Sequence, residues 1–138
     1  MAYASRADIE TLWGADFLSD LLPEDVDADA AIATALRFAS SEIDAHLSAR
    51  YELPLATSPE ILISPAANIA VYIAANQHAS LTTTIEERYK QAVELMKRIA
   101  EGKAGLGAAE PAISIDGASS DSGAAFFAEP RAWGRGRP

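Results

Sequence analysis

The hydrophobic positions that follow Asp29 form the longest helical pattern in the chain. Apolar residues recur there at steps of three and four, at Ile32, Leu36, Ala39, Ile43 and Leu47. Residues at this spacing share one face of an α-helix, so the pattern predicts a helix about six turns long. The pattern stops in the segment Arg50–Leu55, because its proline has no backbone N–H and disfavours helical backbone in the residue before it.

A rigid apolar turn is therefore expected after the long helix. Its residues are Tyr51, Leu53, Pro54 and Leu55. The simplest role of this turn is to close the helical core, with Tyr51 and Leu53 packing on a central helix further along the chain. A role in a subunit interface is the alternative.

Two short helices are predicted before the long one. A serine able to cap a helix precedes residues 6–13, and Gly14 follows them as a stop signal. Residues 15–22 supply four apolar side chains for a further one or two turns, which a proline ends. An acidic loop then leads into the long helix, with Asp27 or Asp29 as its N-cap.

Two longer helices are predicted after the turn, with a single helical turn at about residues 60–63 before them. Residues 65–80 are apolar almost all round and begin with Pro65, so this segment should be the most buried helix. Thr84 and Glu87 have the spacing of a capping box and predict the start of the last helix. The fold class is accordingly all-α, a four- to five-helix bundle with an extended C-terminal arm.

Length and composition suit one small globular domain. The chain has 138 residues, of which 49% are hydrophobic, and this is sufficient for a core without covalent cross-links. It has no cysteine, which excludes disulfides and thiolate metal sites. No apolar run reaches the length of a membrane span, and the first ten residues lack the basic and apolar regions of a signal peptide.

The net charge of −9 is concentrated in residues 1–60, which hold twelve acidic residues and three arginines. This balance argues against sequence-specific binding of nucleic acid, because Lys and Arg supply most of that affinity. An acidic surface repels DNA, which helps where DNA must slide without sticking. The candidates for facing DNA are the acids in the loop before the long helix and at its start: Glu24, Asp25, Asp27 and Asp29.

The same acids resemble the start of a calcium-binding loop. Asp25, Asp27 and Asp29 stand at its first three ligand positions, but Ala30 replaces the glycine and Leu36 the glutamate that such a loop requires. Acids favoured by a helix N-terminus are the better interpretation. The sequence shows no nucleophile–base pair or metal-ligand set, so we expect no catalysis, cofactor or metal. A hydrolase with a dispersed active site is the alternative.

The composition changes after the predicted helical body of residues 1–106. Gly, Ala and Ser predominate in residues 107–125, which indicates a linker. Residues 126–138 are basic and aromatic, so they can anchor in pockets and pair with carboxylates on a partner or a neighbouring subunit. The residues predicted to dock are Phe126, Phe127, Arg131, Trp133, Arg135 and Arg137. An RNA-binding Arg-Gly segment is the alternative.

Four segments carry a resemblance to a known family. They read YASRADIETLWG, SSEIDAHLSARYELPL, ANIAVYIA and ERYKQAVELMKRIAEGKAGLG. Together they resemble a family of small proteins of Mu-like tailed phages and prophages, over residues 2–107. The helical pattern of that family is similar to that of the head–tail connector proteins of long-tailed phages.

The resemblance implies a non-enzymatic structural protein of the virion, made in the host cytoplasm. Connector adaptors form a ring, usually of twelve copies, which lies under the portal and extends the DNA channel toward the tail. The implied partners are further copies of the chain, the portal protein, a head–tail stopper or tail terminator protein, and passing DNA that is not bound sequence-specifically, with no membrane. The alternative is a small helical accessory or regulatory protein of the prophage that acts in DNA packaging.

Overall fold

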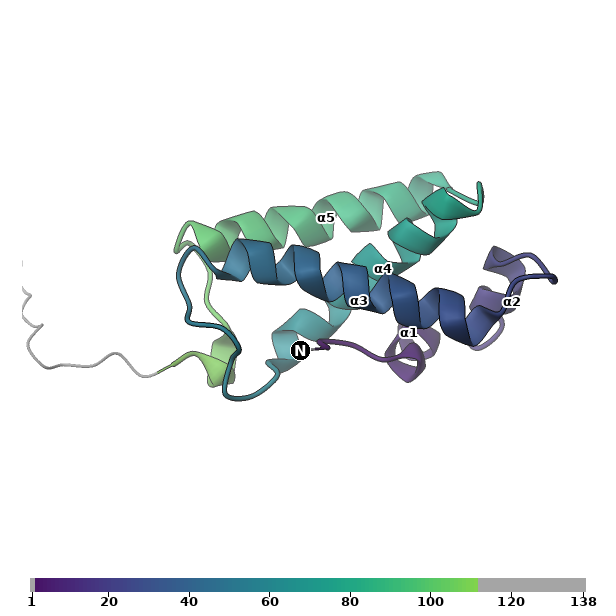
Figure 1. Ribbon diagram of the computed structural model, residues 1–138. Helices are drawn as coiled ribbons and strands as arrows, with labels where there is room; N and C mark the ends of the chain where they lie inside the picture. The colour runs from purple at the N-terminus through teal and green to yellow at the C-terminus, as the bar shows by residue number, and fades with distance from the viewer. Residues whose placement is uncertain (1, 112–138) are drawn as a thin grey trace, which may run out of the picture.

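The computed structural model describes residues 2–111, where five α-helices pack around one core (Figure 1). These helices are α1 (Arg6–Trp13), α2 (Phe17–Leu21), α3 (Ala28–Leu47), α4 (Ile63–Gln77) and α5 (Thr83–Ala100), with 3-10 helices η1 (Glu60–Leu62) and η2 (Gly107–Ala109). The described residues contain no strand, which confirms the all-α class. The predicted docking segment 126–138 and the linker beyond residue 111 lie outside them.

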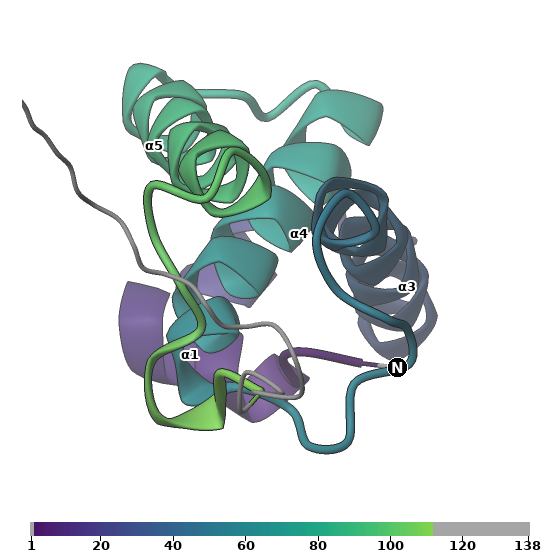
Figure 2. The same cartoon turned by 90° about the vertical axis from the view of Figure 1, so that its left-hand side faces the viewer.

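Helix α4 occupies the centre of the bundle. It lies between α3 and α5 and also packs against α1 (Figure 2). Its buried residues are found all around the helix, as its apolar sequence predicts: Pro65, Ala66, Ala67, Ile69, Ala70, Val71, Ala74 and Ala75. Five of these are alanines, and small side chains let neighbouring helices approach closely.

Helix α3 covers one side of α4 with the face that the sequence predicts. Ile32, Ala39, Ile43 and Leu47 are buried and Leu36 is half-buried. The helix ends at Leu47, before the predicted stop, because residues 48–50 form a turn whose last amide donates to the Leu47 carbonyl at 3.0 Å. The Leu53–Pro54 peptide bond in the following segment is cis.

The ends of α4 differ from the prediction. The helix begins at Ile63, directly after η1, so Pro65 is its third residue and not its first. Proline is tolerated there because the first amides of a helix have no intrahelical partner. The helix ends at Gln77 instead of residue 80, and Ala79 then adopts a left-handed backbone with φ +57°.

Helix α5 also begins earlier than predicted. The N-cap is Thr82, whose hydroxyl oxygen accepts a hydrogen bond from the Ile85 amide at 3.3 Å. The capping box predicted for Thr84 and Glu87 is therefore wrong, and both residues lie inside the helix. Thr82 and Thr84 stand two residues apart and can each cap a helix, and the sequence spacing selected the wrong one.

The N-terminal segment is part of the core. Tyr3 is 2% exposed, its amide donates to the Ser40 hydroxyl at 3.4 Å, and its own hydroxyl donates to the Asp44 carboxylate. Ser5 then caps α1 in a capping box, and Gly14 ends it with φ +107°, a backbone region that favours glycine. Both roles agree with the sequence prediction.

The lysines of the chain lie on one edge of the bundle. Lys90 and Lys97 are exposed on α5, and Lys103 is exposed just beyond it. Lys97 stands in the last turn of α5, where positive charge interacts favourably with the helix dipole. No helix in the described part of the chain is long and apolar enough to cross a membrane.

Candidate interaction surfaces

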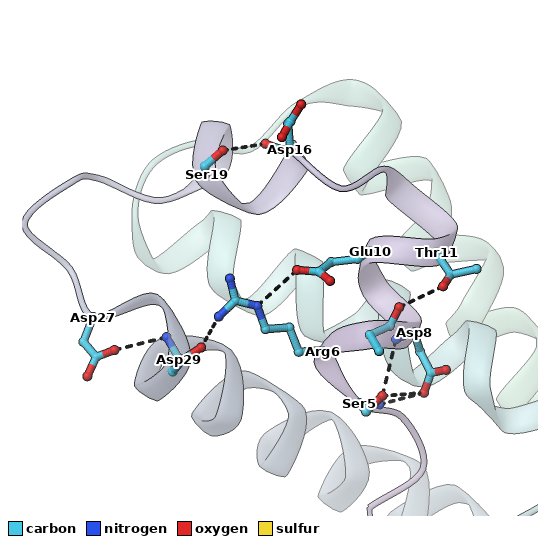
Figure 3. Close-up of polar contacts among 10 residues, drawn as sticks. Ser5, Arg6, Asp8, Glu10, Thr11, Asp16, Ser19, Asp27 and Asp29 are labelled. Atoms are coloured by element: carbon cyan, nitrogen blue, oxygen red, sulfur yellow. Dashed lines mark hydrogen bonds and ion pairs between the residues drawn. The ribbon is translucent and has the colours of Figure 1, made fainter.

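The four acids predicted to face DNA lie in or beside the loop from α2 to α3, and all four are exposed. Figure 3 shows two of them in structural roles. The Asp27 carboxylate accepts hydrogen bonds from the amides of Asp29 at 3.1 Å and Ala30 at 3.4 Å, which makes Asp27 the cap of α3. Asp29 forms an ion pair with Arg6, whose guanidinium also lies 3.3 Å from Glu10.

Glu24 and Asp25 differ from this structural pair. Within residues 2–111, neither side chain takes part in an ion pair or a side-chain hydrogen bond. The carboxylates of Glu24 and Asp25 are therefore available to contact a partner, whereas the Asp27 carboxylate caps α3. The described residues contain no group of three or more acidic or histidine side chains arranged to hold a metal ion.

A second polar cluster joins the turn after α3 to the chain that follows α5. We call Arg50, Tyr51 and Glu110 the clasp. The Arg50 guanidinium donates to the carbonyls of Ile99 at 2.9 Å and Ala104 at 3.1 Å, and it lies 3.6 Å from the Glu110 carboxylate. Arg50 thereby adds a second donor to the Ile99 carbonyl at the end of α5, which also accepts a hydrogen bond from the Gly102 amide at 3.1 Å.

Glu110 completes the clasp from the other side. One of its carboxylate oxygens accepts hydrogen bonds from the Tyr51 hydroxyl at 2.7 Å and the Leu106 amide at 2.8 Å. These two bonds and the charge of Arg50 lower the pKa of Glu110, and the Leu106 amide contributes most. The pKa of Tyr51 is raised, first by burial and then by the Glu110 carboxylate.

The clasp holds the chain against the bundle as far as residue 110. Residues 107–109 form η2, and Glu110 is bonded to the turn. The linker predicted from residue 107 thus begins with a segment that is folded onto the body, and the boundary predicted at residue 106 lies inside that fold.

The predicted turn residues border the clasp. Tyr51 and Leu53 are half-buried and pack against the core, Leu55 is buried, and Pro54 is exposed. This packing matches a core role for the turn, while a role in an interface stays a prediction. A surface groove of about 570 Å³ lies between the turn and the end of the described chain, and Tyr51, Glu52, Pro54, Leu55 and Pro111 line part of it.

Sequence reasoning identified Tyr51 but missed its two partners. Tyr51 and Glu110 are 59 residues apart, and no local pattern relates them. One signal was present: Glu110 is the only charged residue between Lys103 and Asp116. An isolated charge in a stretch of small residues could have suggested a specific contact.

Replacing Glu110 by alanine should release the segment after α5. The change removes the acceptor of two hydrogen bonds and the partner of Arg50, and the loss of such charged contacts corresponds to about 1–3 kcal/mol. Trypsin cleavage after Lys103 requires local opening, so we expect it to accelerate about tenfold or more. Cleavage can be followed by mass spectrometry.

Glu52→Ala is the matched control for this prediction, because Glu52 is exposed and its side chain makes no hydrogen bond or ion pair within residues 2–111. Lowering the pH should release the segment after α5, as Glu110→Ala does. A carboxylate with a lowered folded-state pKa stabilises the fold above its unfolded pKa, and this stabilisation is lost as the pH falls through the folded value. The Leu106 amide resonance should report that opening. Equal rates of trypsin cleavage in the wild-type, Glu110→Ala and Glu52→Ala proteins would contradict the role of the clasp.

Similarity to known proteins extends over the described body. A family model described as "Bacteriophage Mu, Gp36" matches residues 3–122, which include all five helices and the clasp. The chain is also 29% identical over 136 residues to "Mu-like prophage FluMu protein gp36" of Haemophilus influenzae, with 96% of this chain and 93% of that protein covered. These matches agree with the resemblance noted in the sequence, and the chain belongs to the Bacteriophage Mu Gp36 family.

Proposed function

We propose that this protein is a structural component of the virion, a head–tail connector adaptor. In this proposal several copies, twelve in the usual connector, form a ring below the portal, extend the DNA channel and link the capsid to the tail. The observation that carries the proposal is membership of a Mu phage family over residues 3–122, together with the connector-like helical pattern of the sequence. The protein then acts by assembly and not by catalysis.

The geometry of the body supports this proposal in two ways. The exposed acids Glu24 and Asp25 stand at one end of the bundle, where they would repel DNA. The described chain leaves the clasp at Pro111, from which the basic and aromatic segment 126–138 can extend to the portal or a neighbouring subunit. The tail-side partner in this proposal is a stopper or terminator protein.

Lysine at both Glu24 and Asp25 is expected to slow the ejection of DNA from particles. If these acids line the channel, the substitutions place positive charge next to the phosphates, which would hold DNA that otherwise slides. Thermal unfolding should change little, because exposed side chains without contacts typically contribute within about 0.5 kcal/mol. Ejection can be measured by the release of dye-stained DNA.

Asp27→Ala provides the contrast for this experiment. It removes one acid of the same loop and also the cap of α3, so it should lower the free energy of unfolding by about 1 kcal/mol. Its effect on ejection should be smaller than that of the double lysine variant. Wild-type ejection by Glu24→Lys/Asp25→Lys particles would show that these two acids do not face the DNA.

Labelling of assembled particles tests the connector function itself. An antibody or gold label directed at this protein should mark the junction between head and tail in negatively stained particles. Phage that lack the protein should accumulate DNA-filled heads without tails. Label that is absent from mature particles, together with empty heads, would favour the alternative of an accessory protein in DNA packaging.

A further inference from the structure

We propose that the groove beside the clasp receives residues 126–138 of a second copy of the chain, so that neighbouring subunits join head to tail. This contact deepens the connector function proposed above and rests on it. Each copy would supply one groove and one docking segment. A contact of this kind between two different surfaces is heterologous, and it forms a ring when the rotation between copies closes.

The groove has the chemistry to bind an aromatic and cationic peptide. Its volume of about 570 Å³ is within the usual size of ligand pockets. The Tyr51 ring, Pro54 and Leu55 form an apolar wall on which the aromatic residues of the segment, including Trp133, can pack. The Glu52 carboxylate, on the same groove, has no partner within residues 2–111.

Charge favours the same occupant. Up to residue 111 the chain carries eight basic and seventeen acidic residues, whereas residues 126–138 carry three arginines and one glutamate. Arg50 does not oppose a cationic peptide, because its guanidinium is already engaged by two carbonyls and by Glu110. Glu52 therefore remains as the groove carboxylate that can pair with an arginine of the docking segment.

The intervening chain is long enough to reach a neighbour. Fourteen residues separate Pro111, on the wall of the groove, from Phe126. When extended they can span up to about 46 Å. Helix α3, with 20 residues, is only about 30 Å long. The docking segment can thus pass along the body of an adjacent subunit to the groove on that subunit.

Charge reversal in the full-length protein tests the contact. One variant carries Arg131→Glu, Arg135→Glu and Arg137→Glu, and the other carries Glu52→Lys. Each should raise the concentration for half-maximal assembly at least about tenfold, because like charges would then face each other across the contact. Combining all four substitutions in one chain should restore part of the assembly. Native mass spectrometry gives the size distribution.

A mixture of the two reversed variants identifies which chain provides the segment. The Glu52→Lys chain keeps an intact docking segment and the arginine-reversed chain keeps an intact groove, and the reversed segment and reversed groove also carry opposite charges, so the mixture should form assemblies that contain both chains. If each segment docked in the groove of its own chain, the wild-type protein would stay monomeric, and this result would overturn the proposal.

Glu87→Lys is the matched control, since it places the same charge change on an exposed glutamate of α5 and should assemble normally. Normal assembly of the arginine-reversed chain would also overturn the contact. The connector function would still stand in that case if labelled protein remained at the junction between head and tail.

Discussion

Replacing Tyr3 by alanine is expected to lower the free energy of unfolding by about 3–5 kcal/mol, as for other buried aromatic residues. Tyr3 is 2% exposed although it stands near the start of the chain, and it fixes the N-terminal segment on α3. Its loss would leave a cavity there and remove the hydroxyl that donates to Asp44. Urea unfolding followed by circular dichroism measures the change.

Tyr3→Phe separates the hydroxyl from the ring. It keeps the packing but leaves the Asp44 carboxylate without its donor, which should cost about 1–2 kcal/mol. A cost below 1 kcal/mol for Tyr3→Ala would instead show that the N-terminal segment is detached in solution.

Alkaline pH provides an independent measurement of the same contact. Burial, the hydrogen bond to Asp44 and the charge of Asp44 all raise the pKa of Tyr3. The resulting stabilisation is complete below the unfolded value of about 10 and is lost as the pH rises toward the folded one. Tyr3→Phe should lack this part of the pH dependence.

Truncation after Pro111 is expected to abolish the attachment of tails while leaving the body folded. The described core lies entirely within residues 2–111, so thermal unfolding should match that of the full chain. The shortened chain lacks the basic and aromatic segment 126–138, which can supply pocket anchors and ion pairs. We expect DNA-filled heads that lack tails or leak DNA, as seen by negative-stain microscopy.

Truncation after Leu106 is the informative comparison. It removes Glu110 as well, and Tyr51 and Arg50 lose a partner, so the free energy of unfolding should fall by about 1–3 kcal/mol. Tail attachment should be lost in both truncated proteins. Normal tails on particles with the chain ending at Pro111 would show that residues 112–138 are dispensable, and failure of that chain to fold would place part of the core in them.

Sequence periodicity predicted the helices well because burial and helical geometry act over neighbouring residues. The face of α3 from Ile32 to Leu47 and the all-round burial of α4 both follow from spacing alone. Helix ends were less accurate where two local signals competed. Thr82 and Thr84 can each cap a helix, and Pro65 is compatible with more than one position in a first turn.

The polar contacts between distant segments were outside the reach of sequence patterns. Tyr3 bonds to Asp44 across 41 residues, and Tyr51 bonds to Glu110 across 59. Such pairs depend on how the helices pack, and packing is determined by the whole core. The sequence could name the acidic loop but not separate Glu24 and Asp25 from Asp27 and Asp29, because only the folded chain shows which acids are engaged.

The confinement of the lysines to the α5 edge determines how the assembly can be mapped chemically. Amine-reactive reagents modify lysine side chains, and here these are Lys90, Lys97 and Lys103. Any lysine–lysine cross-link between two copies must therefore start and end on the α5 edge. Such a cross-link would show that α5 edges of adjacent copies lie within the span of the reagent. Dyes or gold clusters coupled to these amines would likewise mark one known side of each subunit.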